Sequence, residues 1–191
     1  FIGKSNVALI LGDNFFYGQN LSANLINSAK LTSGAKVLLH KVAKPELFGV
    51  AKINKKNKII SIKEKPKKFL SDLAITGLYF FDNNVIKYSK KLKPSKRGEI
   101  EIVDLLNKYK KNNNLYANFL GRGGAWLDTG SMDDYYKTSA FVSAVENRQG
   151  LKIACLEEIA FNNKWINDSH IKRSIKFYGN CDYSNYLSKL I

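Results

Sequence analysis

The chain has 191 residues, 45% of them hydrophobic, and 31 Lys and Arg against 16 Asp and Glu give it a net charge of +15. This length fits one domain, or one domain with a small appendage, and the composition excludes a disordered, collagen-like or low-complexity chain. The longest apolar runs are far shorter than a membrane span, and the first residues lack the basic start of a signal peptide. Two cysteines are too few for a disulfide framework, which favours a reducing cytoplasm.

The positive charge is scattered along the chain. Only four of the basic residues are arginines, and they do not cluster; the lysines often stand beside asparagines. Nucleic-acid binding would use a basic groove, so a Lys- and Asn-biased surface is the better interpretation, and neither a nucleic-acid nor a membrane partner is expected. A milder role for the charge is the attraction of polyphosphate substrates.

Apolar runs and amphipathic segments alternate over the first two thirds of the chain. The run at 7–11 is continuous and ends in Gly12-Asp13-Asn14, which predicts a buried parallel strand with a loop at its carboxyl end. Further strands are predicted at 35–42, 74–81 and 115–120, a hairpin at 49–53 and 58–62, and helices at 21–30, 85–92 and 99–110.

The pattern changes after Gly130. Ser131, with two aspartates close behind it, is a typical helix start, and an apolar stripe follows to residue 146. One more short strand is predicted at 151–155, and short helices after it. We therefore expect an α/β core over residues 1–130 and a mostly helical C-terminal region over 131–191.

The opening of the chain is unusual. It begins with Phe1 and reaches a core strand within seven residues. A doubly wound sheet usually opens with a strand, a Gly-rich turn and a helix, and ligands bind at the carboxyl ends of its strands. Because this unit is not seen, the expectation is that the chain is a fragment.

Two aspartates stand in similar contexts and are candidate metal ligands. Asp13 follows the apolar run at 7–11, and Asp128 lies in Trp126-Leu127-Asp128-Thr129-Gly130, between a strand and a helix. On neighbouring strand ends they could share a Mg²⁺ ion, which takes one or two carboxylates together with substrate phosphates. The alternative for Asp13 is a turn-capping role.

A second candidate group is basic. Pro66 is expected to hold Lys65 in an extended conformation, as a point charge for a phosphate, while Glu64 could accept sugar hydroxyls. The alternative is a solvated charge pair in a basic loop. Arg97, one of only four arginines, precedes a predicted helix and is a further candidate; the alternative is an ordinary surface residue.

Other chemistries find no support in the sequence. It has neither a P-loop nor an HExxH motif, and the Gly-rich turn at 121–124 is too short to indicate a phosphate cradle. His40 and His170 are isolated, and His40 lies in a predicted strand, where a packing role is favoured over catalysis. Cys155 and Cys181 lack a nearby histidine or a CxxC spacing, so buried or incidental thiols are the better interpretation.

Several short motifs occur in order along the chain. They are the run from Leu11 to Gly18, Phe48-Gly49-Val50, Glu64-Lys65-Pro66, Thr76-Gly77-Leu78-Tyr79-Phe80, Arg97-Gly98-Glu99, Gly121-Arg122-Gly123, the run from Trp126 to Gly130, 146–150 and Glu157-Glu158-Ile159-Ala160-Phe161. Together they resemble the glucose-1-phosphate thymidylyltransferases, bacterial enzymes of the sugar nucleotidyltransferase group, and the resemblance covers nearly the whole chain. The first of these runs together with that from Trp126 to Gly130 is the most specific part.

This resemblance implies a three-layer α/β/α nucleotidyltransferase (Rossmann-like) fold. It also implies an enzyme in which glucose 1-phosphate attacks dTTP, giving dTDP-glucose and pyrophosphate for rhamnose or deoxysugar synthesis. Such chemistry needs positioning and charge neutralisation more than a protein nucleophile. By resemblance, Asp13 and Asp128 hold Mg²⁺, and Trp126 helps to position Asp128. The remaining site residues bind the sugar phosphate: Lys65 and Arg97 contact its phosphate, Gly49 and Glu64 face the sugar, and Ile75 and Tyr79 line the pocket.

The resemblance further implies a regulatory nucleotide site and a homotetramer with contacts from the C-terminal helices. The regulatory residues are Gly18, Gly121, Arg122 and Glu158, and Asn162 stands where an arginine is usual, which bears on feedback inhibition by dTDP-rhamnose.

Two departures concern the substrate sites. The family's N-terminal triphosphate loop is expected upstream of Phe1, so the chain alone is expected to be inactive, and Phe48 stands where tyrosine is frequent. A silent sugar-phosphate-binding or regulatory subunit, and a uridylyltransferase of the same fold, are the alternatives.

Overall fold

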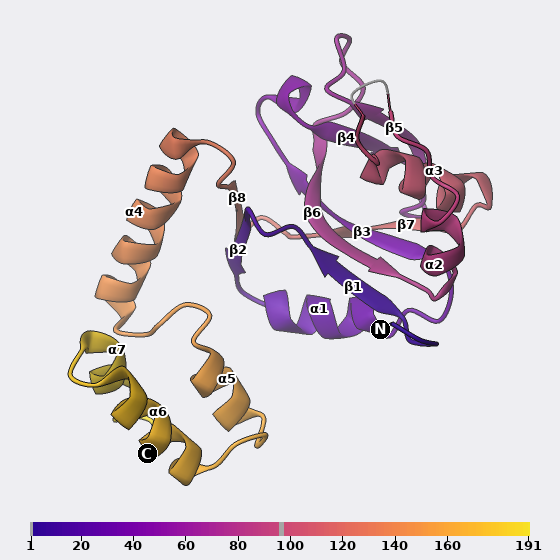
Figure 1. The fold of residues 1–191 in the computed structure, drawn as a ribbon. Helices are drawn as coiled ribbons and strands as arrows, with labels where there is room; N and C mark the ends of the chain where they lie inside the picture. The colour runs from indigo at the N-terminus through magenta and orange to yellow at the C-terminus, as the bar shows by residue number, and fades with distance from the viewer. Residues whose placement is uncertain (1, 96–97) are drawn as a thin grey trace. The chain divides into compact units, whose positions relative to one another are not determined.

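The computed structural model describes residues 2–95 and 98–191, which form two compact units, Phe1–Ser131 and Met132–Ile191 (Figure 1). The first unit is built around a sheet and the second is helical. Among the described residues, no helix combines the length and apolar character needed to cross a bilayer.

Six strands of the described residues form a mixed sheet in the first unit. Their order is β5-β4-β6-β3-β7, with β1 also paired to β6. The long strand β6 runs antiparallel to β1, β3 and β4, whereas β3 and β7 are parallel. The strands are β1 (Val7–Ile10), β3 (Ala35–Lys41), β4 (Gly49–Ile53), β5 (Ile59–Glu64), β6 (Leu73–Phe81) and β7 (Leu115–Phe119).

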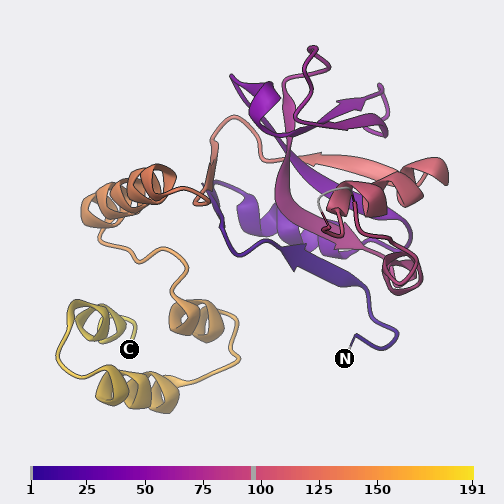
Figure 2. The same ribbon diagram turned by 45° about the horizontal axis from the view of Figure 1, so that its top comes forward.

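Helices cover both faces of this sheet, as Figures 1 and 2 show. Side chains alternate along β6, because successive residues of a strand point to opposite faces. Leu78 and Phe80 join the cluster under α1 (Leu21–Ala29), and Tyr79 and Phe81 join the cluster under the other two helices. Those helices are α2 (Asn84–Ser89) and α3 (Ile102–Lys111). Burial on both faces explains why β6 is a continuous apolar run, and the predicted three-layer α/β/α fold is confirmed.

A separate two-stranded antiparallel ribbon joins β2 (Asn14–Gly18) to β8 (Gly124–Asp128). Asn14 pairs with Asp128 at one end and Gly18 with Gly124 at the other. A Cβ on Gly18, whose φ is +152°, would lie 2.6 Å from the Cα of Gly124, so only glycine permits this approach. We call this element the β2·β8 ribbon.

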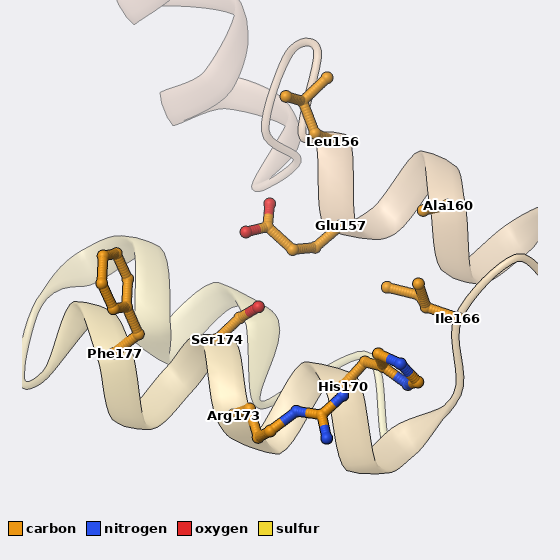
Figure 3. A pocket seen from close by; sticks show the side chains of 8 residues that line it. All are labelled: Leu156, Glu157, Ala160, Ile166, His170, Arg173, Ser174 and Phe177. Atoms are coloured by element: carbon orange, nitrogen blue, oxygen red, sulfur yellow. The ribbon is translucent and has the colours of Figure 1, made fainter.

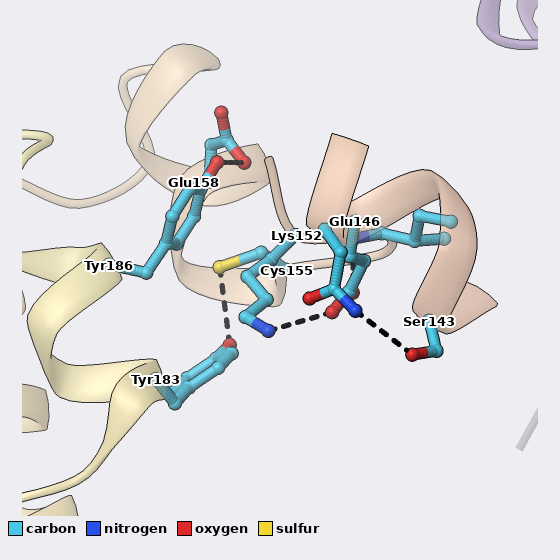
Figure 4. Close-up of polar contacts among 9 residues, drawn as sticks. Ser143, Glu146, Lys152, Cys155, Glu158, Tyr183 and Tyr186 are labelled. Carbon is cyan, nitrogen blue, oxygen red and sulfur yellow. Dashed lines mark hydrogen bonds and ion pairs between the residues drawn. The ribbon is translucent and has the colours of Figure 1, made fainter. Parts of the chain in front are cut away.

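The second unit contains α4 (Met132–Gln149), α5 (Leu156–Asn162), α6 (Asp168–Tyr178) and α7 (Asp182–Leu187). Its small core gathers Cys155, Ile171, Tyr186 and Leu187. Polar contacts tie the loop after α4 to that helix, since Lys152 and Glu146 form an ion pair of 2.7 Å (Figure 4).

Two sequence predictions about strands are wrong. The strand at 7–11 is antiparallel and largely exposed, with Ile10 56% exposed, because β6 is its single neighbour in the sheet among the described residues. Residues 151–155 form a turn instead of a strand. There the backbone N–H of Ile153 donates to Glu146 Oε1, Ala154 has φ +54°, and Cys155 precedes α5.

Candidate active site

One cavity of about 290 Å³ in the first unit brings together most of the predicted site residues. It opens where the loop before β2, the β4–β5 hairpin, β6 and β8 converge. Arg97 lies outside the described residues. The predicted residues that line this cavity are Asp13, Gly49, Glu64, Lys65, Ile75, Tyr79, Trp126 and Asp128.

The β2·β8 ribbon places the two aspartates side by side. Asp13 directly precedes Asn14, which pairs with Asp128. A Cβ built on Gly130 would lie 2.9 Å from Asp128 Oδ1 and 3.9 Å from Asp13 Oδ2, so both carboxylates face the same small space. The predicted route to this proximity, neighbouring ends of parallel strands, is wrong, because an antiparallel ribbon outside the main sheet creates it.

This pair of carboxylates fits a magnesium ion. Magnesium is bound through one or two carboxylates and keeps waters and substrate phosphates as its other ligands. In the described part of the chain, no cluster of three or more His, Cys, Asp and Glu side chains could hold a metal. The two carboxylates offer only oxygen donors, which magnesium prefers, whereas zinc sites are usually built from His and Cys.

The β4–β5 hairpin supplies the glutamate of the cavity. Gly49 lies opposite Glu64 in the ladder, and a Cβ on Gly49 would lie 2.7 Å from Glu64 Oε2. Because Gly49 has no side chain, the Glu64 carboxylate can lie directly over it.

The backbone of Lys65 differs from the prediction. Its φ is +39°, in the left-handed region, whereas the following Pro66 led us to expect an extended conformation. The ladder provides the reason, because the N–H of Lys65 donates to the carbonyl of Phe48 at 3.0 Å and fixes the peptide there. Such a conformation costs about 1–3 kcal/mol and is typical of residues held for function.

Tyr79 and Ile75 on β6 line the cavity beside Glu64 and Asp13. Burial, and then the nearby charges of Glu64 and Asp13, raise the pKa of Tyr79 well above its usual value of about 10. The side chain is therefore a neutral phenol throughout the physiological range.

Trp126 on β8 packs against two aromatic rings and makes one polar contact. Its ring centroid lies 5.1 Å from that of Phe48 and 6.4 Å from that of His40. Its Nε1–H donates to Asn14 Oδ1 at 2.6 Å, and Asn14 in turn donates to Asp13. Trp126 is thus connected through Asn14 to Asp13, whereas the resemblance implied that Trp126 positions Asp128.

Sequence reasoning did not single out Asn14 or Gly77 as site residues, although both line the cavity. Each stands inside a motif that carries the resemblance. The available signal was the position of Asn14 between an aspartate and a run of aromatic residues.

The predicted regulatory residues fall into two places. Gly121 and Arg122 line a second cavity of about 770 Å³ beside His40, and Gly18 lies against Gly124, another lining residue. Glu158 belongs to the second unit, where its Oε2 accepts a hydrogen bond from Tyr186 at 2.7 Å (Figure 4).

The second unit has a cavity of its own, about 460 Å³, between α5 and α6 (Figure 3). His170 lines it, but its Nδ1 lies 2.7 Å from Asn167 Oδ1 in the capping box of α6. His170, which is isolated in the sequence, therefore has a helix-capping role. The lining residues are Leu156, Glu157, Ala160, Ile166, His170, Arg173, Ser174 and Phe177.

Residues 1–145 match the family model described as nucleotidyl transferase. The chain belongs to the nucleotidyl transferase family. The family model covers all of the candidate active site and ends within α4.

Relatives named glucose-1-phosphate thymidylyltransferase match this chain over its entire 191 residues or nearly so. The protein from Neisseria meningitidis is 46% identical over 191 residues, and that from Xanthomonas campestris is 41% identical over 190. The chain spans 66% of the first relative and 64% of the second.

Among solved structures, the fold resembles a UDP-glucose pyrophosphorylase complexed with UDP-glucose. The TM-score is 0.63 at 26% identity, over 73% of this chain and 57% of the other.

Proposed function

We propose that the protein containing this chain transfers a thymidylyl group from dTTP to glucose 1-phosphate, giving dTDP-glucose and pyrophosphate. One observation carries the proposal: a single cavity holds two adjacent carboxylates, Asp13 and Asp128, together with Lys65 and Glu64. The names of the curated relatives support the same reaction.

In this reaction a phosphate oxygen of glucose 1-phosphate attacks the α-phosphorus of dTTP. The new O–P bond forms as the bond to the β-phosphate oxygen breaks, and pyrophosphate leaves with that electron pair. Asp13 and Asp128 would hold Mg²⁺, which when bound supplies positive charge against the phosphates. Catalysis then consists of positioning and charge neutralisation, so no protein nucleophile is required.

Lys65 and Glu64 bind opposite ends of the sugar phosphate in this proposal. The ammonium of Lys65 pairs with the phosphate, and the Glu64 carboxylate accepts hydrogen bonds from sugar hydroxyls. Gly49 lets Glu64 lie along the hairpin, and Ile75 and Tyr79 form the wall against which the ring packs. Arg97 is proposed as a further phosphate ligand.

The finer assignments rest on the resemblance. We propose dTDP-rhamnose or deoxysugar synthesis as the use of the product, a homotetramer as the assembly, and the cytoplasm as the location. A role in binding a regulatory nucleotide is proposed for Gly18, Gly121 and Arg122 of the first unit and for Glu158 of the second, each within its own unit. Residues 1–130 would supply the catalytic core and 131–191 the oligomer contacts.

The test is a product assay on the protein in its natural length, with dTTP, glucose 1-phosphate and Mg²⁺. Formation of dTDP-glucose and pyrophosphate in equal amounts is expected. The likeness to a UDP-glucose pyrophosphorylase makes uridylyl transfer the second candidate, and equimolar dTTP and UTP in competition decide between them. Binding of glucose 1-phosphate without turnover would favour a silent subunit instead.

A further inference from the structure

Asn14 joins the loop before β2 to both β6 and β8. We propose that Asn14 is a positioning residue, whose amide holds one oxygen of the Asp13 carboxylate so that the other faces Asp128. This inference rests on the proposed function, because it concerns the same pair of carboxylates, and it assigns Asn14 a role that acts through Asp13.

The hydrogen bonds of Asn14 determine which way its amide points. Trp126 Nε1–H donates to Asn14 Oδ1 at 2.6 Å, and the backbone N–H of Gly77 donates to the same oxygen at 3.2 Å. Two donors on one atom identify that atom as the oxygen, since an amide nitrogen cannot accept them. The Nδ2 group therefore faces Asp13 and donates to its Oδ1 at 2.7 Å.

Gly77 limits the rotation of this amide. A Cβ on Gly77 would lie 2.6 Å from both Cγ and Nδ2 of Asn14, so the amide lies directly against the bare Cα in β6. Gly77 is buried in the middle of that strand, with φ outside the left-handed region. The need for glycine here thus comes from contact with Asn14, and the strand holds the amide in place.

The consequence is an ordered pair of carboxylates. Asp13 Oδ1 is held by Asn14, while its Oδ2 is the atom that lies near Gly130. Asp128 Oδ1 accepts the backbone N–H of Gly130 at 2.7 Å and lies near the same point. Each carboxylate is thus oriented by a protein donor before any ligand binds, which reduces the ordering cost of binding a cation.

The test compares Asn14→Ser and Asp13→Asn, alone and combined, in the natural-length protein. Mn²⁺ is titrated alone and with dTTP, and bound metal is followed by water-proton relaxation, a readout independent of turnover. Loss of such a supporting group typically weakens metal affinity about 10- to 100-fold, and we expect at least about tenfold for Asn14→Ser. In the Asp13→Asn background the same change is expected to have less than about a twofold further effect.

Controls separate positioning from folding. Asn24→Ser removes another side-chain amide of the first unit, one that donates to the Phe119 carbonyl, and is expected to leave Mn²⁺ affinity unchanged. Trp126→Phe removes a donor to Asn14 while keeping both aspartates, and is expected to weaken Mn²⁺ binding in the same direction. Thermal unfolding of every variant shows whether a loss of affinity follows a loss of fold.

Three outcomes would overturn the inference. In the first, Asn14→Ser binds Mn²⁺ as the unchanged protein does, and in the second it weakens binding equally with and without Asp13. In the third, Asp13→Asn alone leaves Mn²⁺ affinity unchanged, which removes the metal site itself and this inference with it. The product assay then still reports whether the protein transfers a thymidylyl group.

Discussion

Thr129 holds the backbone of Asp13 by two hydrogen bonds to one carbonyl oxygen, from its N–H at 2.7 Å and from its Oγ1 at 2.9 Å. These bonds continue the β2·β8 ribbon by one residue beyond the pair of Asn14 and Asp128. Two motifs more than a hundred residues apart in the chain are thus locked in register, and this register puts both carboxylates beside Gly130.

Removing either carboxylate is expected to slow dTDP-glucose formation by orders of magnitude. Asp13→Asn and Asp128→Asn keep the size of the side chain but lose the charge that would bind Mg²⁺, and several kcal/mol of transition-state stabilisation with it. Initial rates at saturating substrates measure the effect. Asp133→Asn, an exposed change in α4, is the control, and near-normal turnover in both active-site variants would rule out the metal assignment.

Lys65→Ala is expected to raise the KM for glucose 1-phosphate about 10- to 100-fold. A charge-assisted hydrogen bond contributes about 1.5–3 kcal/mol, and Ala removes it. Lys67→Ala is the matched control, because Lys67 is an exposed lysine of the same segment that does not line the cavity.

Lys65→Gly should raise the KM for glucose 1-phosphate as much as Lys65→Ala does. It should unfold at a higher temperature than Lys65→Ala, since Gly accepts φ +39° without strain. Equal KM values for Lys65→Ala and the unchanged protein would contradict the phosphate role.

Gly49→Ala is expected to weaken sugar binding with little change in stability. The new Cβ would lie 2.7 Å from Glu64 Oε2, at the end of a flexible side chain that can swing away from its position in the cavity. We expect the KM for glucose 1-phosphate to rise several-fold while that for dTTP stays the same. Gly123→Ala, where an added Cβ meets no atom within 4 Å, is the control, and an unchanged KM in Gly49→Ala would argue against Glu64 as a sugar ligand.

The second unit is expected to lose stability between pH 10 and 12. Burial, and then the hydrogen bond to Glu158, raise the pKa of Tyr186 to about 12, whereas an unfolded tyrosine ionises near pH 10. Below pH 10 the contribution of Tyr186 to the stability of the folded unit is fully present. It is lost as the pH rises toward 12, because the unfolded chain then releases a proton that the folded chain keeps.

Tyr186→Phe tests this pH dependence. The variant lacks the hydroxyl, so its free energy of unfolding should fall less steeply above pH 10, although it starts about 1 kcal/mol lower at pH 7 without the hydrogen bond to Glu158. Urea unfolding at pH 8, 10 and 11 measures both slopes. Tyr183, whose pKa burial also raises, is present in both proteins, so parallel slopes would show that Tyr186 does not carry the effect.

Local patterns were enough to predict most of the secondary structure. The hairpin around residues 54–57 and the apolar strand β6 were found from the sequence, because strand periodicity and turn residues act over a few positions. The strand at 7–11 was recognised but not its environment. Its direction and exposure depend on which strand lies beside it, and a continuous apolar run carries no such information.

The candidate site divides in the same way. Residue type and short spacing were enough to place Asp13, Asp128, Lys65 and Glu64 at strand ends. The alignment of the two aspartates by the β2·β8 ribbon, and the hydrogen bond from an Asn14 amide packed on Gly77 to Asp13, are visible only in the folded chain. These relations depend on long-range register and on side-chain packing between segments distant in the chain, which local sequence patterns do not specify.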